Sequence, residues 1–127
     1  MKDLPASFRH IRLLLAREKG HPGGDGDHGY DIVAPLDADG RIDAELFKAH
    51  RGICRVRRFR PDEEDAVGKL VHGPGGRWSF DYDSADSSDD EVAFRFGDET
   101  FAIGEYISIR EDDGDMHTFV VVQVNEV

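Results

Sequence analysis

The chain has 127 residues, a net charge of −11 and a single cysteine. This length suits one domain and leaves no room for a second core of comparable size. The sequence lacks the run of about 18 apolar residues that a membrane-spanning helix needs, and one cysteine excludes an intramolecular disulfide.

The first segment of the chain has two readings. Ile11, Leu13 and Leu15 alternate with other residues, as in a strand, whereas a capped amphipathic helix over residues 8–19 is the alternative. After a Gly-rich loop at residues 20–29, apolar residues alternate again from Tyr30 to Leu36. We favour the strand, because two alternating runs joined by a loop are typical of a β-hairpin.

A short helix is predicted next, over residues 44–51. Asp43 is a suitable N-cap, Ile42 and Phe47 have the spacing of a hydrophobic staple, and Gly52 suits the position after the helix. Basic character at Arg51 also suits the C-terminal end of the helix dipole.

From residue 53 onward the pattern predicts strands. They are expected at 53–60, 67–71, 77–82, 92–96, 105–110 and 118–124. Trp78, Phe80 and Tyr82 share one face and form a core side, and the valines at 120, 122 and 124 repeat this spacing. The run 57–59 breaks the alternation, which favours a bulge or an edge strand there.

The predicted fold is therefore mainly β: a twisted antiparallel sheet or small barrel of about six to eight strands with one short helix. We expect residues 1–127 to form a single domain. Mobile loops are predicted near residues 20–29 and near 82–91, where acidic and serine residues leave few apolar side chains to bury.

Charge is unevenly distributed along the chain. Residues 1–60 hold 12 Lys/Arg against 9 Asp/Glu, a balance of +3, while residues 61–127 hold 4 against 18, a balance of −14. A basic cluster of Arg55, Arg57, Arg58 and Arg60 is the candidate partner face. Its alternative role is pairing with the acidic half of the same chain. A protein partner is expected, because the net charge disfavours nucleic acid. Neither a membrane partner nor an oligomeric state is indicated.

The loop at 20–29 supplies a second candidate site. His21, Asp25, Asp27 and His28 are residue types that ligate divalent metals, and they crowd a short segment. A solvated hairpin connection is the competing reading, because ordering a Gly-rich loop around a metal is costly. No cofactor is predicted outright, and a divalent metal is the alternative.

Outside these two segments, Cys54 is the remaining candidate for a reactive side chain. Cys54 lies next to Arg55, and a neighbouring positive charge favours a reactive thiolate, although small cysteines are also common in cores. We find no complete catalytic constellation, so a binding or regulatory module for a macromolecular partner is favoured over an enzyme.

Four segments carry a resemblance: residues 10–13 (HIRL), the loop 20–29, residues 36–40 (LDADG) and residues 104–109 (GEYISI). Together they resemble a family of small acidic single-domain bacterial proteins of uncharacterised function. The resemblance implies a bacterial protein and brings no activity or site residues. A cytoplasmic location is expected, since the first 20 residues lack the features of a secretory signal.

Overall fold

The computed structural model describes residues 7–16, 25–61, 63–73, 77–82, 91–93, 99–111 and 114–126. Within this part of the chain, eight strands, one α-helix and one 3-10 helix are found. The strands are β1 (Phe8–Leu15), β2 (Asp25–Pro35), β3 (Arg55–Phe59), β4 (Ala66–His72), β5 (Trp78–Tyr82), β6 (Glu91–Ala93), β7 (Tyr106–Arg110) and β8 (Met116–Glu126). The helices are α1 (Ala44–Ala49) and the 3-10 helix η1 (Arg51–Ile53). The predicted mainly β fold is confirmed.

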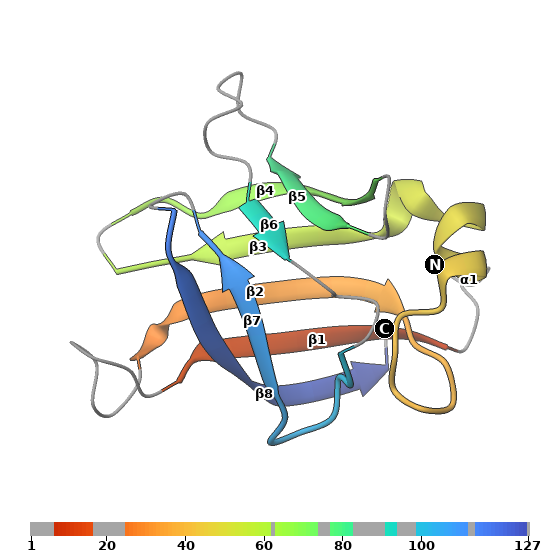
Figure 1. The fold of residues 1–127 in the computed structure, drawn as a ribbon, viewed down its shortest axis with the longest axis horizontal. Coiled ribbons are helices and arrows are strands. Elements are labelled where there is room, and N and C mark those ends of the chain that lie inside the picture. The colour runs from red at the N-terminus through yellow and green to blue at the C-terminus, as the bar shows by residue number, and fades with distance from the viewer. Residues whose placement is uncertain are drawn as a thin grey trace.

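The strands form a closed antiparallel barrel in chain order, with α1 at one end (Figure 1). β1 pairs with both β2 and β8, which completes the closure. The β6–β7 junction is held by one residue pair, Val92 with Arg110. Every strand therefore has a neighbour on both sides, which removes the exposed edges of an open sheet.

The first segment is a strand, as favoured, and not a helix. Ile11, Leu13 and Leu15 point into the barrel and are buried, while the intervening side chains are only partly covered. Every second side chain of a strand points to the same side of the sheet, so Ile11, Leu13 and Leu15 all face the core. The prediction of a loop over residues 20–29 was wrong for residues 25–29, which belong to β2. Residues 20–24 and 83–90 lie outside the described residues.

Large side chains pack the interior of the barrel. Trp78, Phe80 and Tyr82 all face inward, as the alternation in β5 predicts. The largest fully buried side chains are Trp78, Tyr30, Phe8, Phe80, Phe101, Phe119, Ile11, Leu13, Ile32, Ile107 and Ile109. Burial of this many large apolar groups is the main stabilising contribution to the fold.

The face assignment for β8 was wrong over part of its length. Phe119 and Val121 point inward, whereas Val120 and Val122 are partly exposed. The pairing of β1 with β8 shifts register between Arg12 and Leu13. This irregularity returns Val124 to the core side, where it packs against the buried cluster.

The expected bulge or edge at residues 57–59 is also wrong. β3 lies between β2 and β4, and its register with both is continuous. The alternation is broken because Arg58 occupies an inward position. Its guanidinium carbon lies 4.9 Å from the centre of the Tyr82 ring, so an aromatic face accommodates the buried cation.

The helix forms where the capping residues predict it, but it ends at Ala49 and not at Arg51. The Asp43 side chain accepts hydrogen bonds from the backbone N–H groups of Glu45 and Leu46, both at 3.1 Å. Arg51 belongs to η1, which tightens the last turn before β3. Phe47 is the buried residue of the helix and packs its ring 4.9 Å from that of Trp78.

Candidate partner-binding face

The four arginines of the predicted partner face do not share one face of the barrel. Arg55 and Arg57 point outward from β3 and are exposed. Arg58 is 7% exposed and points inward, and the Arg60 side chain is 12% exposed. The reason is the period of a strand, which sends alternate side chains to opposite sides of the sheet. A partner role for Arg55 and Arg57 stays a prediction.

One aspartate on β2 contacts three basic side chains of β1 and β3. Asp31 is largely buried, and His10 and Arg12 lie 3.2 Å and 3.7 Å from its Oδ1 atom. Arg57 donates to its other carboxylate oxygen and lies 3.5 Å from Asp65. Of these cations only Arg57 belongs to the predicted arginine cluster, and its two partners are Asp31 in the first half of the chain and Asp65 in the second.

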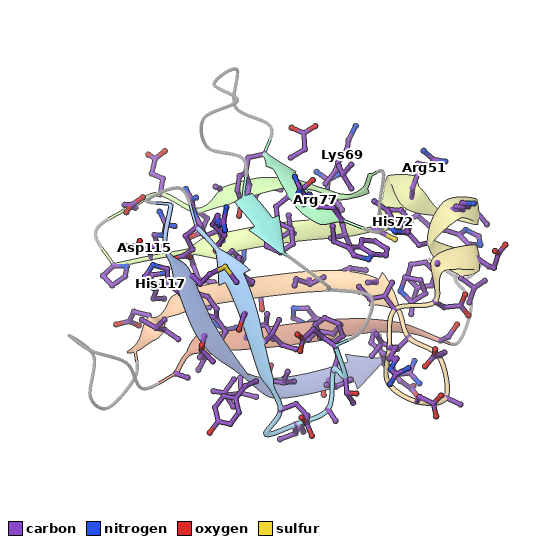
Figure 2. The ribbon with its side chains drawn as sticks, in the orientation of Figure 1. Arg51, Lys69, His72, Arg77, Asp115 and His117 are labelled. Carbon is purple, nitrogen blue, oxygen red and sulfur yellow. The ribbon has the colours of Figure 1, made fainter. Side chains whose placement is uncertain are left out.

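A pocket of about 200 Å³ lies between the helical segment and β4. It is lined by Phe47, Arg51, Gly52, Lys69, Leu70, Val71 and His72. Arg51, Lys69 and His72 gather at the same end of the barrel as α1 (Figure 2). The lining therefore joins apolar side chains from the core to cations at the surface.

The aromatic wall of the pocket follows from strand register. His72 and Trp78 lie directly opposite each other in the β4–β5 hairpin. Their rings are stacked at 4.1 Å with an interplanar angle of 2°, and the Phe47 ring meets the His72 ring nearly edge-on at 6.4 Å. His72 is exposed and Trp78 is buried, so the indole supports the imidazole from the core side.

Two cations with long side chains, Arg51 and Lys69, line the pocket. Arg51 and Lys69 are exposed, and neither forms an ion pair with any residue that the structure describes. Exposed Arg55 lies directly across from Lys69 in the β3–β4 pairing. A chain with a net charge of −11 thus concentrates positive charge beside an apolar pocket.

A second polar cluster lies at the opposite end of the barrel, where His117 is seen in Figure 2. Its centre is the buried Glu111 carboxylate, which accepts hydrogen bonds from the Tyr30 hydroxyl at 2.5 Å and from His28 Nε2 at 3.1 Å. Arg60 lies 3.2 Å from the same oxygen, and His117 Nε2 lies 3.7 Å from the other.

Glu111 is held in its charged form. Burial alone would raise its pKa, but hydrogen bonds from His28 and Tyr30, together with the charges of His28 and Arg60, lower the pKa to about 2. The hydrogen-bond donors and the positive charge around Glu111 therefore stabilise its ionised form. A buried carboxylate that is charged at neutral pH and is contacted by all of these side chains links β2, β7 and β8. It is less suited to exchanging protons near neutral pH.

The predicted metal ligands are only partly covered by the description. His21 and the Asp25 side chain lie outside it, Asp27 is exposed on β2, and His28 contacts Glu111. Among the described residues, no group of three or more His, Cys, Asp or Glu side chains is arranged to hold a metal ion. Metal binding by the 20–29 segment stays a prediction.

Cys54 is a core residue, and burial raises its pKa to about 11. We expect Ellman's reagent at pH 8 to react at least about 100-fold more slowly with the native protein than with protein unfolded in guanidinium, because the thiol is both protonated and covered. Comparable rates in the two states would show that Cys54 is accessible and reactive.

Comparisons with known proteins add no identity: no family model matches the chain, and neither a curated protein nor a solved structure does so significantly. Among the described residues, no helix combines the length and the apolar character that membrane crossing demands. The function must therefore be inferred from the geometry of the pocket beside α1 and of the Glu111 cluster.

Proposed function

We propose that this protein is a binding module that docks an acidic segment of a protein partner at the pocket beside α1. The observation that carries the proposal is the pair Arg51 and Lys69, which are exposed without ion pairs in the described chain and flank an apolar pocket. Exposed cations of this kind steer an acidic partner and select against a basic one.

The proposal replaces the four-arginine face by a smaller one. Only Arg55 and Arg57 of that set are exposed, and Arg57 lies opposite Val67 of β4, which does not line the pocket. Arg55 lies next to Lys69 and extends the basic rim of the pocket along β3. The partner face that we propose therefore consists of Arg51, Arg55 and Lys69.

Charge reversal tests this function. A random peptide library is selected on the immobilised wild-type protein, and the selected peptides are then measured on two double variants. We expect the peptides to be rich in Asp and Glu, and their affinity to fall about tenfold or more in Arg51→Glu/Lys69→Glu, because two favourable charge contacts become repulsive.

The matched control is Arg41→Glu/Lys48→Glu. Both residues are exposed, and neither lines the pocket, so this variant makes the same change in net charge elsewhere. Affinity should stay within about threefold of wild type, because neither replaced side chain lines the pocket and salt screens exposed charges that make no direct contact. Equal losses in the two variants, or selected peptides without acidic residues, would contradict the proposed face.

A further inference from the structure

The size of the pocket restricts what it can accept. Its volume of about 200 Å³ lies below the roughly 300–1,000 Å³ of sites that enclose a drug-sized ligand or cofactor. A space of this size suits one side chain of a partner. Interfaces commonly place such an anchor in a well-packed pocket and surround it with weaker contacts.

The shape of the wall favours a planar anchor. The His72 ring is backed by the parallel Trp78 ring, which is itself wedged against Phe47. A flat, supported imidazole in a pocket wall offers a stacking surface with little freedom to lose on binding. Leu70 of β4 adds an apolar surface to the pocket, beside the ring of His72 on which an aromatic group can stack.

We infer that the pocket takes one aromatic side chain of the partner, flanked by Asp or Glu residues whose carboxylates pair with Arg51 and Lys69. This inference rests on the proposed function and adds the chemistry of the partner motif. Aromatic burial provides most of the affinity, because exposed ion pairs are individually weak. Arg51 and Lys69 favour acidic residues on either side of the aromatic side chain in the partner.

A stretch of single-stranded nucleic acid fits this surface less well, although a base could also stack on His72. Such ligands need cations that follow several successive phosphates. Here the basic rim is short. Lys69 has Asp81 as its neighbour on β5, and Arg57 on β3 is held by Asp31. Carboxylates on β2 and β5 therefore interrupt the positive surface that Lys69 and the arginines of β3 form.

Trp78 provides a local reporter, since it is the only tryptophan of the chain and lies directly behind His72. Three capped pentapeptides are titrated against the wild-type protein while its fluorescence is followed. They carry phenylalanine between two pairs of glutamates, alanine in the same frame, and phenylalanine between two pairs of lysines. A uridine hexanucleotide serves as the nucleic-acid probe.

We expect the glutamate–phenylalanine peptide to change Trp78 fluorescence and to bind about tenfold or more tightly than the alanine peptide. The lysine peptide should not bind, and Arg51→Glu/Lys69→Glu should lose the interaction while Arg41→Glu/Lys48→Glu keeps it.

Each other result has a distinct meaning. Equal binding of the phenylalanine and alanine peptides, still lost in Arg51→Glu/Lys69→Glu, overturns the aromatic anchor and leaves the proposed function standing. Failure of both acidic peptides to bind, together with no enrichment of acidic peptides in the library selection, overturns the proposed function itself. Tighter binding of the hexanucleotide than of any peptide overturns the choice of a protein partner.

Discussion

Replacing Glu111 with glutamine is expected to lower the free energy of unfolding at pH 7 by about 3 kcal/mol, because the folded state lowers the pKa of this carboxyl from 4.5 to about 2. The substitution keeps the shape of the side chain but removes its charge. It leaves Arg60 buried beside a neutral amide and weakens the hydrogen bonds from Tyr30 and His28. Urea unfolding at pH 7 measures the loss.

The same ion pair network predicts a pH dependence. The pKa of Glu111 is lowered in the folded state, from 4.5 to about 2, so its contribution to stability is fully present above pH 4.5. It is lost as the pH falls from 4.5 toward 2, because the unfolded chain then binds a proton that the folded chain does not. The stability difference between wild type and Glu111→Gln should therefore shrink over this range.

Glu105→Gln is the matched control. Glu105 precedes β7, whereas Glu111 follows it, and Glu105 is exposed. We expect its replacement to change the free energy of unfolding by less than about 0.5 kcal/mol. A difference between wild type and Glu111→Gln that stays constant from pH 7 to pH 3 would show that the charge of Glu111 is not what stabilises the barrel.

Much of the fold could be predicted because strand and helix signals are local. The alternation in β1, β2 and β5 places apolar residues inward, and each of these segments was correctly predicted as a strand. The helix was predicted from its cap at Asp43. Its end was missed because the final turn adopts 3-10 geometry at Arg51, which the capping residues do not distinguish from continued helix.

The Glu111 cluster was not predicted, because closure of the barrel brings together residues far apart in the sequence. Tyr30 and His28 lie 81 and 83 positions before Glu111. A signal was nevertheless present: Ile107, Ile109 and Glu111 share one strand parity, which places a carboxylate on the inward side. A charged residue at an inward position is expected to meet partners there.

The same parity separates the basic cluster. Val56, Arg58 and Arg60 follow one alternation and turn inward, whereas Arg55 and Arg57 follow the other. Treating the four arginines as one patch ignored this rule. Local sequence patterns could not predict the pocket. Arg51 of η1 and Lys69 of β4 come together only when the helical segment packs against the barrel.

Replacing Gly29 with alanine is expected to destabilise the barrel by about 3 kcal/mol, toward the upper end of what overpacking costs. A Cβ atom at this position would lie 2.0 Å from the Leu13 carbonyl oxygen and 3.0 Å from the Phe59 ring. The first clash is with backbone of the neighbouring strand β1, so no change of rotamer relieves it. β1 and β2 would have to separate where His28 and Tyr30 reach Glu111.

Gly26→Ala is the control on the same strand, because no atom lies within 4 Å of a Cβ built there. Alanine at this exposed position restricts the unfolded chain, so stability should be unchanged or rise by about 0.5 kcal/mol. Thermal and urea unfolding of both variants test the argument. Equal stabilities for the two would mean that β1 and β2 are not packed backbone to backbone at Gly29. The close approach, and not the loss of a glycine from β2, is therefore what the pair of variants measures.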